Sequence, residues 1–257
     1  MDVNISPAQG TKAGEVFAAA GVPAAAGATA NAANAGAAKI GAIFDCDGTL
    51  MDTVGGWRSV ESEFARMCGH ELSLEEAQLL ATFTLQETGD YYHNKYGLGK
   101  SAAHVIEMAD EILVNYYQTQ SELRPGVGEF LEGLAQAGVP MTVASSSPQR
   151  YLQAGLQHTG IAGYFKGVFS TDDVGAPKRE PRIYLHAAQH MGTAPANTWG
   201  FEDSLYAVHT LVNAGFKCAG CYDRDDSGTK EQLQAAATLL IPSFAAFTAQ
   251  EFLQVAF

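Results

Sequence analysis

Short apolar runs alternate with segments of helical periodicity along most of the chain from residue 40 onward. A short apolar run bounded by Gly, Pro or polar residues predicts a buried strand, whereas apolar residues that recur with a period of about 3.6 predict an amphipathic helix. The runs that predict strands are residues 40–44, 140–144, 167–169, 198–201, 216–222 and 239–241. The helical segments are residues 125–136, 148–159, 181–191, 205–214 and 230–236, with a further helix at the C-terminus. This alternation predicts an α/β fold with a doubly wound parallel sheet that helices cover on both faces.

A long stretch of helical periodicity interrupts this alternation. Residues 56–119 carry apolar side chains at helical spacing with few strand signals, which predicts about four helices of ordinary length. We therefore divide the folded part into a core of residues 40–53 and 123–257 and an inserted helical cap of residues 54–122. Residues 1–39 are rich in Ala and Gly and have few large apolar side chains, so we expect a flexible leader there.

The composition limits the partners of the protein. The chain has 257 residues, of which 15 are basic and 28 acidic, so its formal net charge is -13. A strongly acidic surface disfavours nucleic acid and anionic membranes, and the absence of a long apolar run argues against a transmembrane helix. The N-terminus has no basic segment followed by an apolar core, so we expect a cytoplasmic location. Four cysteines are too few for a disulfide framework, and we interpret Cys218 and Cys221 as packed residues of a strand.

Polar side chains that can carry chemistry follow four of the predicted strands. They are Asp45 and Asp47, Ser145 and Ser146, Lys178, and Glu202 and Asp203. The carboxyl ends of parallel strands meet at one edge of a sheet, and ligands bind there. We therefore expect these side chains to lie close together, although they are far apart in the sequence.

These residue types suit the transfer of a phosphoryl group. Of the two carboxylates of Asp45 and Asp47, one can attack phosphorus, while the other protonates the leaving oxygen and later activates water. Carboxylates are also the oxygen ligands that Mg²⁺ prefers, and Glu202 and Asp203 can complete such a site. A serine hydroxyl and backbone N–H groups can hold phosphate oxygens, and the ammonium of Lys178 can balance charge on the transferring group.

In their order and spacing, these four clusters resemble the motifs of the haloacid dehalogenase-like superfamily over about residues 40–245. The matching positions are Asp-x-Asp-Gly-Thr-Leu at residues 45–50, Asp52, Thr53, Ser145, Lys178, Glu202 and Asp203. The helical insertion between the first and second motifs resembles the cap of the subgroup that includes phosphoglycolate phosphatases and beta-phosphoglucomutases. The resemblance implies a Rossmann-like core with an inserted α-helical cap.

The resemblance also implies catalytic roles. Asp45 would be the nucleophile that forms an aspartyl-phosphate, and Asp47 would be the general acid and base. Ser145, with Ser146 beside it, and Lys178 would bind the phosphoryl group. Lys178 would also neutralise the charge of Asp45.

A Mg²⁺ site and a small substrate are implied as well. The ion would be bound by the Asp45 carboxylate, the Asp47 backbone carbonyl and Asp203, with Glu202 at or next to the ion. The cap would close over the substrate and exclude bulk water, which favours a small phosphorylated metabolite such as a sugar phosphate or phosphoglycolate. We expect a monomer or a small homo-oligomer.

The sequence departs from the family pattern at several positions. Residues 178–182 read Lys-Arg-Glu-Pro-Arg, where the third motif usually continues Lys-Pro-x-Pro-Asp, and Tyr206 or Ala207 stands where a Gly is frequent. A phosphomutase is an alternative function, but mutase-like relatives carry a His at the position of Trp57. A dehalogenase is a weaker alternative, because relatives with that activity lack the second acid of the first motif, which is present here as Asp47.

A non-enzymatic phospho-acceptor or binding protein is the alternative from another class. Signalling receiver domains also place an acidic cluster, a hydroxyl and a lysine around magnesium, but they are much shorter and have no helical insertion. The lifetime of the aspartyl-phosphate separates the two functions, because a phosphatase turns it over rapidly and a receiver slowly.

Overall fold

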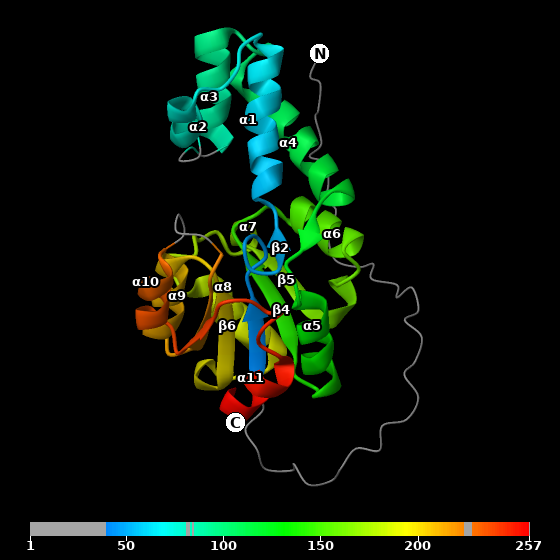
Figure 1. The fold of residues 1–257 in the computed structure, drawn as a ribbon, viewed down its shortest axis with the longest axis vertical. Helices are drawn as coiled ribbons and strands as arrows, with labels where there is room; N and C mark the ends of the chain where they lie inside the picture. Colours follow the sequence, from blue (N-terminus) through cyan, green and yellow to red (C-terminus); the bar gives the residue numbers. More distant parts are fainter. Residues whose placement is uncertain (1–39, 81–82, 84, 224–227, 257) are drawn as a thin grey trace, which may run out of the picture. The chain divides into compact units, whose positions relative to one another are not determined.

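A parallel sheet forms the centre of the described structure. The computed structural model describes residues 40–80, 83, 85–223 and 228–256. The strands of its main sheet are β1 (Gly41–Phe44), β4 (Met141–Ser145), β5 (Phe165–Ser170), β6 (Thr198–Glu202), β7 (Lys217–Cys221) and β8 (Leu239–Ile241). Within the described residues this sheet has six strands in the order β5-β4-β1-β6-β7-β8, and every neighbouring pair is parallel (Figure 1). The first strand of the chain therefore lies inside the sheet, between β4 and β6.

Helices pack on both faces of this sheet. One face packs against α5 (Val127–Gln136), α6 (Gln149–His158) and α11 (Ala249–Ala256), and the other against α8 (Arg182–Met191), α9 (Leu205–Asn213) and α10 (Lys230–Ala236). Successive side chains of a strand point to opposite faces, so Ala42 and Phe44 of β1 join the first apolar cluster and Ile43 joins the second. The predicted doubly wound α/β fold is confirmed.

The predicted elements differ from the structure mainly at the edge of the sheet and in short segments. Strand β5 is longer than the predicted run at residues 167–169, because an edge strand is only partly buried and its apolar pattern is broken. The elements that the sequence pattern does not predict are β2 (Met51–Asp52), β3 (Glu122–Leu123), α7 (Thr171–Val174), η1 (Ala162–Tyr164) and η2 (Pro195–Asn197). Elements of two to four residues are too short to show a hydrophobic period.

The two cysteines of β7 lie on opposite faces of the sheet. Cys218 belongs to the apolar cluster under α8, α9 and α10, and Cys221 to the cluster on the other side. Both are buried free thiols. Their spacing on a strand therefore gives two separate packing residues and no shared redox or metal site.

Two other expectations concern the ends and the surroundings of the chain. The predicted leader, residues 1–39, lies outside the described residues. Among the helices of the described part, none is both long enough and apolar enough to span a bilayer.

Four helices of the described part lie between β2 and β3, in the predicted cap. They are α1 (Val54–Met67), α2 (Leu74–Leu80), α3 (Leu85–Tyr96) and α4 (Ala102–Thr119). Their buried faces form an apolar cluster that includes Val60, Phe64, Tyr92 and Leu113. Strands β2 and β3 pair antiparallel at the base of this insertion, so the chain leaves and re-enters the core at neighbouring positions (Figure 1).

One carboxylate joins α2 to α3. Glu76 accepts hydrogen bonds from the hydroxyls of Tyr91 and Tyr96, the second at 2.7 Å, and from Lys95 Nζ at 3.2 Å. His70 Nε2 lies 3.1 Å from the other oxygen of Glu76. These hydrogen bonds, above all the one from Tyr91, lower the pKa of Glu76 to about 2, although partial burial acts in the opposite direction. Helices α2 and α3 are therefore held together in part by an ionised acid.

Replacing this acid should destabilise the protein at neutral pH and much less in acid. The pKa of Glu76 is about 2 in the folded state, whereas that of a Glu in the unfolded chain is about 4.3. The stabilisation is therefore fully present above about pH 4.3 and is lost as the pH falls toward 2. We expect the difference in melting temperature between wild type and Glu76→Gln to be largest near pH 7 and to shrink as the pH passes below about 4. Glu75→Gln, at the exposed neighbouring position, is the matched control and should melt with wild type. A difference that stays constant with pH would contradict the role of the ionised carboxylate.

Candidate active site

The loop after β1, residues 45–50, holds both acids of the first motif. Asp45 directly follows β1, and its N–H donates to the carbonyl of Phe201 in β6 at 2.9 Å. The loop then turns back on itself, because the N–H of Met51 donates to the carbonyl of Cys46 and the N–H of Gly48 donates to the carbonyl of Met51, each at 2.9 Å. The buried strand and this tight turn fix Asp45 at the carboxyl edge of the sheet.

Gly48 is required at the turn of this loop for two reasons. Its φ is +83°, in the left-handed region that glycine adopts without steric cost. A Cβ at this position would also lie 2.6 Å from Oδ2 of Asp203. The absence of a side chain therefore lets the loop approach the acid that follows β6.

A buried lysine joins two of the acids. Lys178 is 4% exposed, and its ammonium donates to Oδ1 of Asp45 and, at 2.6 Å, to Oε1 of Glu202. The hydroxyl of Tyr184 in α8 donates to the same oxygen of Glu202 at 2.9 Å. A buried charge is tolerated when it is paired and hydrogen-bonded, and here one ammonium serves two carboxylates.

Burial shifts the pKa values of all three charged groups. Burial raises the pKa of Asp45 to about 8; Lys178 opposes this rise, and the carboxylates of Glu202 and Asp47 add to it. Burial likewise raises the pKa of Glu202 against the effect of Lys178. Burial alone would lower the pKa of Lys178, but Asp45 and Glu202 outweigh it and raise that pKa well above its ordinary value. The single ammonium of Lys178 thus faces two carboxyl groups and cannot balance the charge of both. A bound cation would add positive charge and favour the ionised form of Asp45.

Three of the acids lie close enough to bind one metal ion. Asp45, Glu202 and Asp203 are all buried, and each offers a carboxylate oxygen within 4.8 Å of the others. Hard oxygen ligands and an excess of negative charge over the single ammonium of Lys178 fit a hard divalent cation. The carboxylate of Asp47 does not belong to this group of three. That the backbone carbonyl of Asp47 binds the metal ion stays a prediction.

The carboxylate of Asp47 is surrounded by hydroxyl groups. Thr53 Oγ1 donates to Oδ1 at 2.7 Å, and the hydroxyl of Tyr117 donates to the same oxygen. Ser147 Oγ donates to Oδ2 at 2.6 Å, and Ser145 Oγ makes a longer contact of 3.4 Å. Both oxygens are therefore held from several directions, and the orientation of the carboxylate is fixed. The sequence motifs indicate Ser145 as a site residue but do not indicate Tyr117 or Ser147.

The two serines predicted to bind phosphate occupy different environments. Ser145 is the buried last residue of β4, and its Oγ accepts a hydrogen bond from the N–H of Ser147 at 3.0 Å. Ser146 is exposed, and the Thr171 hydroxyl donates to its carbonyl at 3.5 Å. The fold therefore brings Ser145 to Asp47 and leaves Ser146 at the surface.

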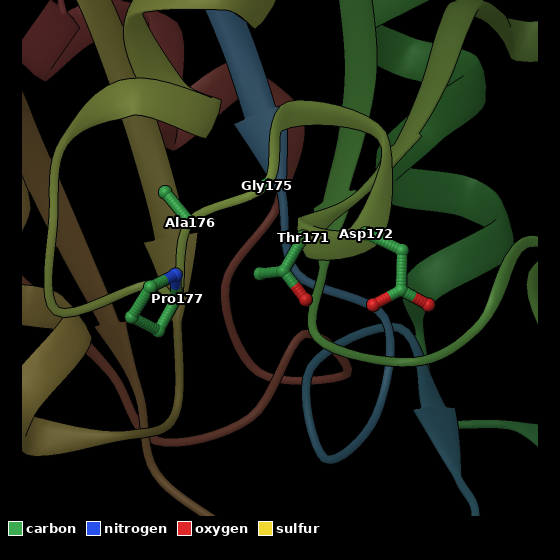
Figure 2. Close-up of a pocket in the computed structure, with 5 residues that line it drawn as sticks. All are labelled: Thr171, Asp172, Gly175, Ala176 and Pro177. Atoms are coloured by element: carbon green, nitrogen blue, oxygen red, sulfur yellow. The ribbon is translucent and has the colours of Figure 1, made fainter.

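A pocket of about 360 Å³ lies on the segment that leads to Lys178 (Figure 2). It is lined by Thr171, Asp172, Gly175, Ala176 and Pro177. None of the residues predicted for catalysis lines this pocket, and the carboxylate of Asp172 would repel a phosphate group. We therefore assign the chemistry to the acidic group around Lys178 and not to this pocket.

Two departures from the family pattern meet in space. The guanidinium of Arg179, which follows Lys178, lies 4.7 Å from the ring centre of Tyr206. Burial raises the pKa of Tyr206, and the charges of Glu202 and Asp45 add to the rise while Lys178 opposes it, so this ring lies within electrostatic reach of the acidic group. The altered third motif and the altered segment after Asp203 therefore form one stacked contact, of a kind that contributes about 0.5–1 kcal/mol at exposed sites.

Further polar residues hold the site, although no sequence motif includes them. Tyr184 orients Glu202 through the hydrogen bond from its hydroxyl. Arg124 donates through Nη1 to the carbonyl of Gly48 and through Nη2 to the carbonyl of Tyr222 at 2.8 Å, and Nη2 lies 3.5 Å from Asp223. Arg124 thus ties the loop after β1 to the end of β7. No local pattern marks these residues, because their roles depend on which elements pack together.

Known proteins identify the class of this molecule. Residues 41–215 match the family model of the haloacid dehalogenase-like hydrolases, and the chain therefore belongs to this family of enzymes. Protein CbbY of Rhodobacter capsulatus is 28% identical over 218 residues, which cover 78% of this chain and 96% of that protein. The phosphoglycolate phosphatase of Pseudomonas putida is 27% identical over 187 residues, which cover 69% of this chain and 67% of that protein. The resemblance drawn from the four sequence clusters is confirmed.

Solved structures agree on the fold. A HAD hydrolase of family IA, variant 3, from Entamoeba histolytica superposes with a TM-score of 0.70 at 24% identity. The match covers 84% of this chain and 99% of that chain, so it includes both the sheet and the helical insertion. At this level of identity the likeness concerns the fold alone.

The close approach at Gly48 gives a first test of the site. Gly48 and Gly69 both have positive φ, +83° and +73°, so an alanine at either position costs about 1–2 kcal/mol in backbone conformation. A Cβ at Gly48 meets Asp203, whereas no atom of the residues that the structure describes lies within 4 Å of a Cβ at Gly69. We expect Gly48→Ala to lower the rate of substrate hydrolysis per folded molecule by about 10²-fold, because it displaces Asp203, and Gly69→Ala to leave that rate unchanged. Denaturant unfolding and initial rates measure the two effects, and equal rates for the two variants would contradict the role of Gly48.

Proposed function

We propose that this chain is a Mg²⁺-dependent phosphatase that hydrolyses a small phosphomonoester through an aspartyl-phosphate on Asp45. The observation that carries this proposal is the buried junction of Lys178 with Asp45 and Glu202, next to Asp203. It brings together a carboxylate that could act as the nucleophile, a fixed positive charge and carboxylates that could bind a metal ion, which supports phosphoryl transfer. The name of the Pseudomonas putida relative, a phosphoglycolate phosphatase, supports the same reaction class.

The reaction would proceed in two halves. In the first, an oxygen of Asp45 attacks phosphorus, the ester P–O bond breaks, and Asp47 gives its proton to the leaving alcohol oxygen. In the second, water attacks the phosphorus of the aspartyl-phosphate while Asp47 takes a proton from that water. Cleavage of the P–O bond to Asp45 then releases inorganic phosphate and restores both acids.

Mg²⁺ would be held by the Asp45 carboxylate, the Asp47 backbone carbonyl and Asp203, with Glu202 beside it. Bound there, the ion supplies positive charge that shields the nucleophile from the phosphate and orients both. Lys178 would balance charge on the phosphoryl oxygens as they reorganise. Its second partner, Glu202, keeps the ammonium in place when Asp45 loses its charge to the acyl phosphate.

The remaining oxygens of the phosphoryl group would be bound at the end of β4. Ser145 and backbone N–H groups of the following loop are the candidate donors there, with the exposed Ser146 as a further candidate. The helices of the predicted cap would close over the substrate, exclude water and restrict the enzyme to small metabolites such as a sugar phosphate or phosphoglycolate.

The mutase alternative is not favoured by the residue at position 57. Trp57 is 37% exposed, and its ring lies edge to face with that of Tyr151 at 6.4 Å between centroids. An indole donates a hydrogen bond but cannot shuttle a proton as the His of mutase-like relatives can. A phosphorylated sugar intermediate would therefore lack that group for the return transfer.

Phosphate release from a panel of small phosphomonoesters tests the proposed function. We expect Mg²⁺-dependent hydrolysis that chelator abolishes, and we expect Asp45→Asn to lower kcat by at least about 10³-fold, because the amide is not a nucleophile. When turnover of wild type is stopped with acid, phosphate bound to the protein should prove short-lived, since the second half-reaction is fast in a phosphatase.

Asp90→Asn is the matched control for the loss of one carboxylate. Asp90 lies on α3 and accepts a hydrogen bond from Gln86 of the same helix at 3.2 Å. This variant should keep wild-type rates. If wild type and Asp45→Asn release phosphate equally, the proposed function is wrong. If the phosphorylated protein persists for many turnover times, it is a phospho-acceptor.

A further inference from the structure

Helix α4 of the predicted cap places a tyrosine hydroxyl on the carboxylate of Asp47. Tyr117 lies in the last turn of this helix and is 0% exposed, and its hydroxyl donates to Oδ1 of Asp47. Thr53, Ser145 and Ser147, which also contact this carboxylate, precede α1 or lie at the end of β4. Of the described residues that donate to this carboxylate, Tyr117 is therefore the one that comes from within the inserted helices.

Tyr117 is itself held by a network between α4 and α6. Its ring stacks on that of Tyr151 in α6, with 5.4 Å between centroids and 15° between planes. The hydroxyl of Tyr151 donates to Oδ1 of Asp110 in α4 at 2.5 Å, and Arg150 Nε donates to the same oxygen at 2.6 Å. A side chain locked by packing and hydrogen bonds holds its neighbour in one geometry, so the docking of α4 on α6 determines where the Tyr117 hydroxyl lies.

The hydroxyl of Tyr117 donates to one of the two oxygens of the Asp47 carboxylate. Thr53 and Tyr117 share Oδ1, whereas Ser147 donates to Oδ2. Removing the hydroxyl of Tyr117 would leave Thr53 on Oδ1 and Ser147 on Oδ2 but take away the donor that α4 supplies, so the carboxylate would be less firmly oriented.

We propose that Tyr117 is a positioning residue for proton transfer by Asp47. This inference rests on the proposed function, in which Asp47 is the general acid and base. Tyr117 does not touch the reacting atoms; it fixes the carboxylate that does, and it can do so only while α4 is packed on α6. Its loss should therefore slow the steps in which a proton moves and leave substrate binding unchanged.

The leaving group of the substrate provides the test. An alkoxide leaves phosphorus only when its oxygen is protonated, whereas p-nitrophenolate leaves with little help from an acid. For Tyr117→Phe, which keeps the ring and its stacking, we expect kcat/KM to fall about tenfold with the best alkyl phosphate of the panel and less than about threefold with p-nitrophenyl phosphate. KM for the alkyl phosphate should stay at the wild-type value.

Tyr116→Phe is the matched control on the same helix. The hydroxyl of Tyr116 lies 3.5 Å from the carbonyl of Asp52 and is directed there instead of to the carboxylate of Asp47, so this variant should match wild type with both substrates. A loss that is equal for the alkyl and the nitrophenyl ester in Tyr117→Phe would indicate a general structural defect and overturn the proposal. No loss with either ester would overturn it as well.

Two further variants keep the test decisive. Asp47→Asn should show the same preference for the nitrophenyl ester more strongly, and adding Tyr117→Phe to it should cause no further loss, because Tyr117 acts through Asp47. Tyr151→Phe keeps the stacked ring but removes the hydrogen bond to Asp110, and it should reproduce a smaller alkyl-selective loss even if Tyr117→Phe does not fold. If Tyr151→Phe affects both esters equally, the dependence on α4 docking is wrong.

These outcomes separate the inference from the proposed function. If wild type hydrolyses no phosphomonoester of either kind, the proposed function fails. If wild type is active and Asp47→Asn is selective while Tyr117→Phe is not, the phosphatase stands and the role of Tyr117 alone is wrong.

Discussion

The ammonium of Lys178 lies buried between the carboxylates of Asp45 and Glu202, and the rest of the site is arranged around this contact. A lysine or an acid buried alone would be strongly destabilising, so each of the three groups depends on the other two. Asp45 follows β1, Glu202 ends β6, and Lys178 comes from the segment after β5. The contact can therefore form only when the carboxyl ends of these strands meet at one edge of the sheet. The chemistry of the site thus depends on the topology of the sheet.

Much of this arrangement could be predicted from the sequence. Buried parallel strands leave short apolar runs, and their carboxyl ends mark one edge, so the sequence alone predicts that Asp45, Ser145 and Asp203 lie together. Elements of a few residues, such as β2 and α7, could not be predicted because they show no period. The contacts of Tyr117 and Arg124 could not be predicted either. They join positions far apart in the sequence, and they depend on helix docking and loop geometry that no local pattern encodes.

The departures from the family pattern illustrate the same limit. In the sequence, Arg179 stands where the third motif usually has a rigid Pro, and Tyr206 or Ala207 stands where a Gly is frequent, so the two departures look unrelated. In the structure they are partners, with the guanidinium of one over the ring of the other. A residue that departs from a linear motif can contact a second such residue that is distant in the chain. The two departures are then better described as one contact.

The interior position of β1 also has a consequence for how the chain folds. This strand is the first of the sheet to leave the ribosome, yet its partners are β4, at Met141–Ser145, and β6, at Thr198–Glu202. Pairings between such distant segments form slowly, because a long loop must close before the contacts are gained. The strand that ends at Asp45 must therefore wait, apolar and unpaired, while the inserted helices and α5 are synthesised, and it gains its second partner only once β6 has formed. This interval is when the nascent chain is most exposed to aggregation, so the helices that separate β1 from its partners set the timing of folding as well as the surroundings of the site.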